Sequence, residues 1–455
     1  MQRAEMIQRT VRIWAAGLAL TGAACSNAVT VDTLLMGGRV LDGAGNPWVV
    51  RDIGIAGDRI TFVGLAADAD LTARDTVDVS GLLVTPGFWD MHSHAELEED
   101  YGRDAAPFLY QGITTVILGV DGGGTNQIDS IFDLYEATGI GVNALRYVGH
   151  GAARRAVMGE DDRAPTPVEL AALEDYVRTG MQQGALGLST GLFYIPGTFA
   201  ETDEVVALNA VAAEFGGVYD THDRDLGAVY KGIGYDASVR EAIEIGERAG
   251  TPVIFSHFNP QGASNYGRAA VGIELIERAR ARGVDVMAAQ HVYTATQSNL
   301  RAYALPSWVS AGGREQMLQR FDDASVQARL DVETMEMLAI RGGAGKILFA
   351  DPRPELNGKT LAEVAAVWQL SVPQTVRRIM SEGNASVMNL DLYDIENTKL
   401  LATREWMMTC TDGRTPPPSA DIVHPRPYGA FSRKLREFVY REEQAIDRRY
   451  VGVQT

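Results

Sequence analysis

The chain has 455 residues, of which 46% are hydrophobic and 22% charged, which is typical of a globular protein with a large core and excludes a disordered chain. Its net charge of −18 and pI of about 4.9 argue against a nucleic-acid-binding protein, because such proteins present basic patches to phosphate. Only two cysteines are present, Cys25 and Cys410, so a disulfide framework is excluded.

Residues 1–25 have the layout of an export signal. Three arginines precede an apolar stretch, Ile13–Ala24, and small residues lead to Cys25. This pattern predicts a signal peptide, too short to span a membrane as a mature helix. The sequence TGAAC leaves open a lipoprotein signal, with Cys25 as the lipid-bearing residue. We therefore expect an exported protein, periplasmic or lipid-anchored to a bacterial membrane, and no later stretch is apolar for the roughly 18 residues of a membrane span.

A small β-domain is predicted for residues 31–84. Short β-rich runs in this segment alternate with Gly-Gly, Asp-Gly and Gly-Asn pairs, which are typical turn signals. We expect hairpins here.

From Leu83 onward, short apolar runs alternate with helical stretches, which predicts parallel βαβ units. Helical patterns cover Pro167–Gln183, Asp203–Phe215, Ser238–Ala249 and Gly272–Arg282. The eight apolar runs are Leu83–Trp89, Thr114–Gly119, Ala144–Gly149, Leu186–Thr190, Gly217–Thr221, Pro252–Ser256, Val284–Ala289 and Trp406–Thr411. Eight such runs favour a (β/α)8 TIM-type barrel over an open sheet, spanning residues 85–455. The seventh-to-eighth gap is too long for one crossover helix, so we expect an insertion at about 297–400, mainly helical and above the catalytic mouth.

Histidines gather at the ends of these runs. Six of the seven fall at or just after a predicted strand end: His92, His94, His150, His222, His257 and His291. His92 and His94 are two residues apart, so in an extended chain they project to the same face. Because the carboxyl ends of barrel strands converge on one mouth, the set predicts a shared site. Neutral imidazole suits zinc, and a catalytic zinc takes three protein ligands and one open position.

Two aspartates complete the expected site. Asp412 lies at the tip of the eighth run, where a carboxylate can hold an activated water and take its proton; a turn residue before Gly413 is the alternative. Asp121 lies at the tip of the second run, where it could bridge two divalent ions, serve as the third ligand of one, or form a turn between glycines. None of the lysines lies on the first four strands, so a carboxylated lysine bridge is excluded.

An ordered set of motifs resembles the N-acyl-D-amino-acid deacylases (D-aminoacylases) of the amidohydrolase superfamily, over roughly Val31 to Ile446. The motifs are PGFWDMHSH, GITTVILG, VGHGAARR, GALGLSTGLFYIPGTFA, YDTHDRD, IFSHFN, VYTA, and TDG followed by HPRPYG. The resemblance implies a (β/α)8 barrel beside a β-sandwich, with zinc hydrolysing the amide bond of an N-acyl-D-amino acid to a carboxylate and a D-amino acid.

The resemblance also assigns roles to individual residues. His222 and His257 match a tight zinc site, His92 and His94 match a weaker second site, and Asp412 matches the acid/base that contacts the metal site. With Asp121 as the third ligand, Asp412 would accept a proton as hydroxide attacks the carbonyl and would return it to the departing amine.

Three further side chains are candidates for substrate binding. Arg224 and Arg426 are candidates to clamp the substrate carboxylate as planar forks, with structural ion pairing as the alternative. Tyr293 is a candidate hydrogen-bond donor.

Several positions depart from the family pattern. Asp121 replaces a common cysteine, Asn259 replaces a common lysine, and His291-Val292-Tyr293 replaces Tyr-Pro-Tyr. The family's C-terminal sandwich strands have no counterpart before Thr455, which leaves the sandwich of residues 31–84 apparently incomplete. Two alternatives therefore stay open: another amidohydrolase reaction, on cyclic amides or dipeptides, and a non-catalytic exported barrel protein inactivated by truncation. Acyl-group preference and oligomeric state are not predicted.

Overall fold

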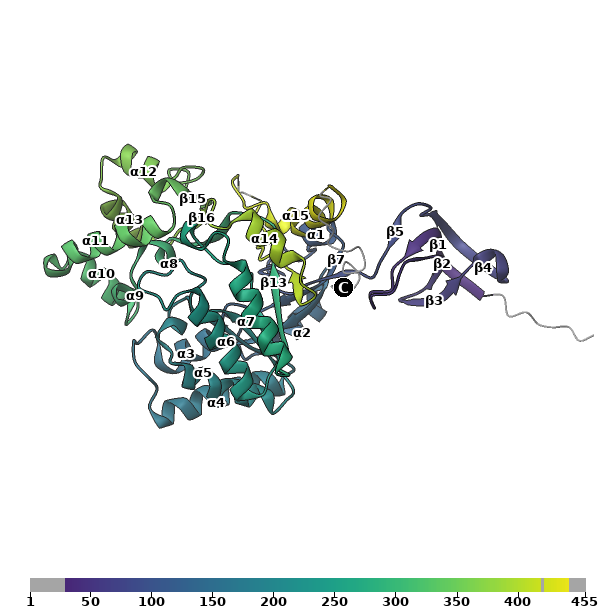
Figure 1. The fold of residues 1–455 in the computed structure, drawn as a ribbon, viewed down its shortest axis with the longest axis horizontal. Helices are drawn as coiled ribbons and strands as arrows, with labels where there is room; N and C mark the ends of the chain where they lie inside the picture. Colours follow the sequence, from purple (N-terminus) through teal and green to yellow (C-terminus); the bar gives the residue numbers. More distant parts are fainter. Residues whose placement is uncertain (1–28, 419–420, 442–455) are drawn as a thin grey trace, which may run out of the picture. The chain divides into compact units, whose positions relative to one another are not determined.

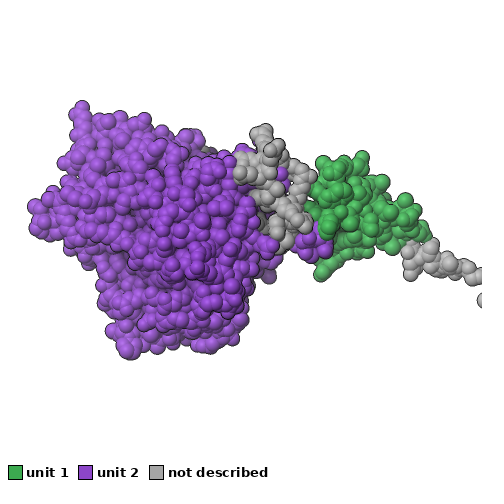
Figure 2. Space-filling view, viewed as in Figure 1, with its two compact units in different colours: residues 1–41, 47–84 green, residues 42–46, 85–455 purple. Residues whose placement is uncertain are grey.

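The computed structural model describes residues 29–418 and 421–441 (Figure 1). The predicted export signal, residues 1–25, lies outside the described residues. The described chain divides into two compact units, one of residues 29–41 and 47–84 and one that comprises 42–46 and continues from Thr85 (Figure 2). No helix of the described residues is both long and apolar enough to cross a bilayer.

The smaller unit is a five-stranded sheet in the order β3-β2-β1-β4, with β5 also paired to β1. Its strands are β1 (Val29–Val40), β2 (Val49–Ala56), β3 (Arg59–Gly64), β4 (Leu71–Asp78) and β5 (Leu83–Val84). The β2–β3 hairpin turns at Gly57, whose φ of 58° suits a tight two-residue turn. The expectation of hairpins holds for β1–β2–β3, but β4 and β5 both run parallel to β1.

The larger unit is an α/β barrel whose strands run parallel. They are β6 (Phe88–Asp90), β7 (Ile113–Leu118), β8 (Asn143–Arg146) with β9 (Val148–Gly149), β10 (Gly187–Gly191), β11 (Val218–His222), β12 (Val253–Phe255), β13 (Val286–Gln290) and β17 (Met407–Thr409). Two sheets contain them, β6-β7-β8 and β9-β10-β11-β12-β13-β17. Backbone bonds from Asp412 to His92 and from His94 to Gly413, both 2.9 Å, link the ends of the first and last strands.

One predicted strand is wrong in its bounds. The run Leu83–Trp89 is not a single buried strand, because Leu83–Val84 belongs to the smaller sheet and the barrel strand begins at Phe88. Pro86 lies between the two strands and has no N–H to donate to a ladder. The histidine pair therefore follows a strand of three residues.

Helices follow the barrel strands and pack on their outer side (Figure 1). They are α1 (Ala106–Leu109), α2 (Ile128–Thr138), α3 (His150–Met158), α4 (Pro167–Gln182), α5 (Thr202–Ala213), α6 (Tyr235–Ala249), α7 (Ala269–Ala281) and α14 (Ile395–Ala402). Local sequence sets their ends: α4 begins with a capping box in which the Thr166 side chain accepts from Glu169 N, and Pro167 occupies its first turn. After β17 come α15 (Arg426–Arg433) and a π-helical segment, Lys434–Arg441.

The long connection between β13 and β17 forms a separate lobe with its own apolar core (Figure 1). Its helices are α8 (Leu300–Ala304), α9 (Ser307–Ser310), α10 (Arg314–Asp322), α11 (Ala324–Ile340), α12 (Leu361–Trp368) and α13 (Val372–Glu382). The expectation of a mainly helical insertion missed an antiparallel sheet of β14 (Thr296–Asn299), β16 (Ser386–Asn389) and β15 (Ile347–Phe349). These strands are three or four residues long, too short to show the alternation of a half-buried strand.

Candidate metal and substrate site

The predicted site residues meet at the carboxyl ends of the barrel strands. His92 and His94 follow β6, and Asp121 follows β7. His222 ends β11, His257 follows β12 and Asp412 follows β17. The structure therefore brings together all six residues that the sequence analysis assigned to the metal site.

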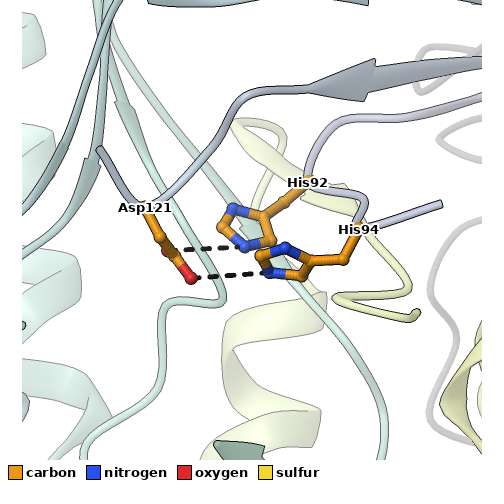
Figure 3. A group of neighbouring side chains, drawn as sticks. All are labelled: His92, His94 and Asp121. Carbon is orange, nitrogen blue, oxygen red and sulfur yellow. Dashed lines mark ion pairs between the residues drawn. The ribbon is translucent and has the colours of Figure 1, made fainter. Parts of the chain in front are cut away.

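Asp121 lies at the centre of this cluster. Its Oδ1 is 3.6 Å from His92 Nε2, and its Oδ2 is 3.4 Å from His94 Nε2 (Figure 3). The same Oδ1 is 3.3 Å from His222 Nδ1 and 3.9 Å from His257 Nε2. Two potential metal-binding groups thus share one carboxylate, Asp121 with His92 and His94, and Asp121 with His222 and His257. We call these five residues the Asp121 cluster.

The backbone at this site is strained. Asp121, His257 and Asp412 have φ values of 56°, 30° and 50°, a region that non-glycine residues seldom adopt. Gly122 makes the turn after Asp121 possible, because a Cβ there would lie 2.9 Å from Gly191 N. Such conformations persist where the surrounding structure enforces them and are concentrated at functional sites.

The donor set fits a zinc ion. His92 is fully buried, and neither ring nitrogen has a hydrogen-bond partner among the described residues. Nε2 of His257 faces Nδ1 of His222 at 2.8 Å, so two ring nitrogens share a space that requires either a proton or a cation. Imidazole nitrogens with a carboxylate are ligands that zinc accepts readily.

Burial and mutual charge adjust the protonation of these groups. Desolvation lowers the pKa of His92 to about 3, which keeps this imidazole in the neutral form that binds metals. Burial also lowers the pKa of His222. Burial opposes ionisation of Asp121, but the adjacent His92 and His222 outweigh it and hold the pKa of this carboxyl well below its usual range. Asp121 is therefore anionic.

Asp412 faces the His92–His94 side of the cluster. Its Oδ1 is 3.6 Å from His92 Nε2 and 3.5 Å from His94 Nε2. Its Oδ2 accepts a hydrogen bond from Arg426 Nη1 and lies 3.8 Å from His291 Nε2. Burial opposes ionisation, but Arg426 outweighs it and lowers the pKa of Asp412, so this carboxyl group is held in its ionised form.

A cavity of about 810 Å³ opens beside the cluster, and the insertion lobe contributes much of its wall. Asp121, His222, His257 and Asp412 line it from the barrel. From the lobe come Tyr303, Trp308 and Arg341, among others.

Two predicted substrate residues do not line this cavity. The guanidinium of Arg224 is saturated by Glu241, with Nε–Oε2 and Nη2–Oε1 distances of 2.8 Å, and by the carbonyl oxygens of Thr198 and Ala200. The Tyr293 hydroxyl is turned to the Pro425 carbonyl oxygen at 3.4 Å. These positions favour the structural alternative for Arg224 and leave Tyr293 away from the cavity, whereas Arg426 does line it.

Other residues of the cavity wall were missed from the sequence. Phe193 stacks on the His222 ring with a centroid separation of 5.2 Å, and Tyr194 packs edge-on against it at 4.6 Å. Both belong to the motif GLFYIPG, which could have flagged them. Arg341 directly follows α11, at a position where no local pattern marks it.

Comparison with curated proteins places the chain among the deacylases. It is 32% identical to the D-aminoacylase of Alcaligenes xylosoxydans xylosoxydans over 436 residues, covering 91% of this chain and 80% of the relative. It is 29% identical to the N-acyl-D-glutamate deacylase of the same organism, covering 91% and 79%. A search of protein-family models found no match.

Comparison with solved structures also gives similarity to deacylases. The N-acyl-D-glutamate deacylase of Bordetella bronchiseptica, complexed with zinc and a phosphonate mimic of the tetrahedral intermediate, superposes with a TM-score of 0.76 at 27% identity, covering 94% of this chain and 84% of that one. A D-aminoacylase structure superposes with a TM-score of 0.75 at 28% identity, covering 93% and 84%. The fold, the ordered motifs and the 32% identity over nearly the whole chain together show that this protein belongs to the D-aminoacylase family of metal-dependent amidohydrolases.

Proposed function

We propose that the protein hydrolyses the amide bond of N-acyl-D-amino acids in a metal-dependent reaction. The observation that carries this proposal is the Asp121 cluster, in which one carboxylate lies between two imidazole pairs, one of which also contacts Asp412. The relatives named above act on N-acyl-D-amino acids, which supports the same substrate class for this chain.

Asp121, His222 and His257 would hold the tighter zinc ion, and His92 and His94 with Asp121 a weaker second one. A zinc ion at such a site lowers the pKa of a water molecule to about 7 and polarises an amide carbonyl. The protein contributes a buried and largely pre-formed set of ligands, because all five side chains come from strand ends that the barrel fixes.

Asp412 would act as general base and then as general acid. Its carboxylate is ionised by Arg426 and lies beside the His92–His94 pair, so it can take a proton from the attacking water. The same oxygen can return that proton to the departing amine. Burial holds the pKa of His291 well below its usual value, so this ring is neutral. Its Nδ1 accepts from Tyr293 N, which leaves the proton on Nε2, an atom unpartnered among the described residues and available to donate to the developing oxyanion.

Arg426 is the candidate for the α-carboxylate of the substrate. It lines the cavity next to Asp412, and its Nε has no partner among the described residues. The α-carboxylate lies two bonds from the scissile nitrogen, so a guanidinium adjacent to the general base is at a suitable distance.

A hydrolysis assay tests the proposal. Protein loaded with zinc should release free amino acid from N-acetyl-D-amino acids faster than from the L-enantiomers, and chelation should abolish the release. Hydantoin and dipeptide substrates serve as comparators for the other amidohydrolase reactions. Zinc-loaded protein that cleaves none of the N-acetyl-D-amino acids would overturn the proposal.

We also propose three features of the chain as a whole. The N-terminal signal would direct export, with periplasmic location or lipid attachment at Cys25, which mass spectrometry of the mature protein would distinguish. The barrel would be closed, supported by the bonds between Asp412, His92, His94 and Gly413. The sheet of the smaller unit would be one layer of a β-sandwich, supported by exposed apolar residues such as Ile60 and Val63.

A further inference from the structure

Arg341 is a buried cation in the wall of the cavity, and it forms no ion pair among the described residues. Only 3% of the residue is exposed, and neither Nε nor Nη1 has a hydrogen-bond partner among the described residues. Its guanidinium lies over two aromatic rings, 4.1 Å from the Tyr303 centroid and 5.4 Å from the Phe193 centroid. Burial lowers the pKa of Arg341, and Asp225, which lies beyond ion-pair distance, offsets this only in part.

The other cations of the cavity differ from Arg341. Within the described chain, each is either exposed, as is Arg155, or paired with a carboxylate. Arg301 pairs with Glu160 at 3.2 Å, and Arg329 pairs with Glu333 at 3.0 Å. Arg341 forms no ion pair with any described carboxylate, although a buried cation is ordinarily paired. An anionic group from outside the chain would supply the missing partner.

The position of Arg341 indicates which anionic group this is. Phe193 stacks on His222, and the guanidinium of Arg341 lies over the same ring, so Arg341 and a candidate metal ligand contact one aromatic side chain. Arg426 is adjacent to Asp412 and so to the scissile amide. A carboxylate close to the amide suits Arg426, whereas a carboxylate several bonds further away suits Arg341.

The position of the guanidinium is fixed by its surroundings. Arg341 directly follows α11, and its carbonyl oxygen accepts a hydrogen bond from Asn389 Nδ2 at 2.9 Å, which ties the helix end to β16. Stacking on two rings restricts the side chain. A pre-positioned planar fork can bind a carboxylate at a low entropic cost.

Resting on the proposed function, we propose that Arg341 is a specificity-determining residue that binds the side-chain carboxylate of an acidic N-acyl-D-amino acid. The position of Arg341 favours a carboxylate remote from the scissile amide, and the side chain of N-acyl-D-glutamate carries such a carboxylate. The neutral amide isostere would leave the guanidinium uncompensated and would be a poorer substrate.

The test compares kcat/KM for N-acetyl-D-glutamate, N-acetyl-D-glutamine and N-acetyl-D-leucine in zinc-loaded wild type and Arg341→Met. We expect the wild type to have a higher kcat/KM for N-acetyl-D-glutamate than for N-acetyl-D-glutamine. In the variant, kcat/KM should fall about 100-fold for N-acetyl-D-glutamate alone, as expected for the loss of a hydrogen-bonded charge pair. Arg341→Lys should recover part of the preference. Equal losses of kcat/KM on all three substrates would overturn the proposal, because they would indicate that Arg341 binds the α-carboxylate or has a purely structural role. A wild type that prefers N-acetyl-D-glutamine would also overturn it.

A matched control variant and a second substrate test whether the effect is specific to Arg341 and to the amino-acid side chain. Arg329→Met removes a cavity-lining arginine that also stacks on an indole, Trp308 at 4.2 Å, but is paired with Glu333; it should leave the glutamate-to-glutamine ratio unchanged. N-succinyl-D-leucine places its remote carboxylate on the acyl side, and dependence on Arg341 for that substrate instead of glutamate would overturn the side-chain assignment.

If the zinc-loaded wild type cleaves nothing, the proposed function fails, and calorimetric binding of D-glutamate against D-glutamine still tests Arg341. If the wild type binds D-glutamate more tightly than D-glutamine and Arg341→Met abolishes this preference, the proposed role of Arg341 is supported. If the wild type shows no such preference, the proposed role is contradicted.

Discussion

Two buried groups of imidazole and carboxylate lie near the carboxyl ends of the barrel strands, and they differ in how their charges are compensated. In one, Glu204 accepts from His150 Nε2 at 2.8 Å and from Arg154 Nη1 at 2.5 Å, so both carboxylate oxygens are occupied. Only His150 Nδ1 and Arg154 Nε have no partner among the described residues. In the Asp121 cluster, four imidazoles surround one carboxylate and both nitrogens of His92 are unpartnered.

The contrast shows that a histidine at a strand end does not by itself mark a metal site. The His150 group compensates its own charges and lines no part of the large cavity, which is typical of a structural ion network. The Asp121 cluster places several ring nitrogens around one space and opens on the cavity, which is typical of a binding site.

Substitution of Asp412→Asn should give the largest effect. The amide cannot accept the proton, so kcat on N-acetyl-D-amino acids should fall about 10³-fold, within the range for loss of a general base. The tighter zinc ion, assigned to Asp121, His222 and His257, should be retained when metal content is measured by atomic emission. Turnover close to that of the wild type would contradict the assignment.

Substitution of Glu204→Gln should act on stability instead. It leaves the fully buried Arg154 without its anion, which typically costs about 3–5 kcal/mol of unfolding free energy. Urea unfolding should show this loss, while zinc stoichiometry of the folded protein stays unchanged. A loss of zinc would show that the two groups are coupled and that the distinction between them is wrong.

Removal of zinc should destabilise the wild type. At a free zinc concentration 100 to 1,000 times the dissociation constant, a bound ion contributes about 3–4 kcal/mol to the native state. Chelation should therefore lower the wild-type melting temperature, measured by scanning calorimetry. Asp121→Asn should largely abolish this shift, and Glu204→Gln should retain it; equal shifts in wild type and Asp121→Asn would remove Asp121 from the ligand set.

The smallest effect should be a pH dependence of the Glu204 contribution. Burial opposes ionisation of Glu204, but His150 and Arg154 outweigh it and hold the pKa below the usual value. A depressed folded-state pKa means that the stabilisation is complete above about pH 4.3, the unfolded pKa, and declines as the pH falls further. The melting temperatures of wild type and Glu204→Gln should therefore converge below pH 4, and a constant difference down to pH 3 would contradict this reading.

The barrel and the metal-site residues could be read from the sequence because both depend on local rules. Alternation of apolar runs and helical patterns indicates parallel strands, and parallel strands in a barrel bring their carboxyl ends to one mouth. His92, His94, Asp121, His222, His257 and Asp412 were identified in this way. The short strands of the insertion could not be predicted from the sequence, since three or four residues carry too little periodicity.

Only the tertiary structure decided how the arginines are used. Arg224 and Arg426 look equally suited to bind a substrate carboxylate, but Glu241 saturates one and Asp412 contacts the other. Arg341 follows a helix of the insertion, and only packing of that lobe brings it to Phe193, 148 residues earlier in the chain. Residue type and spacing determine which groups are available along each strand or helix, whereas long-range packing determines which charges are left without a partner.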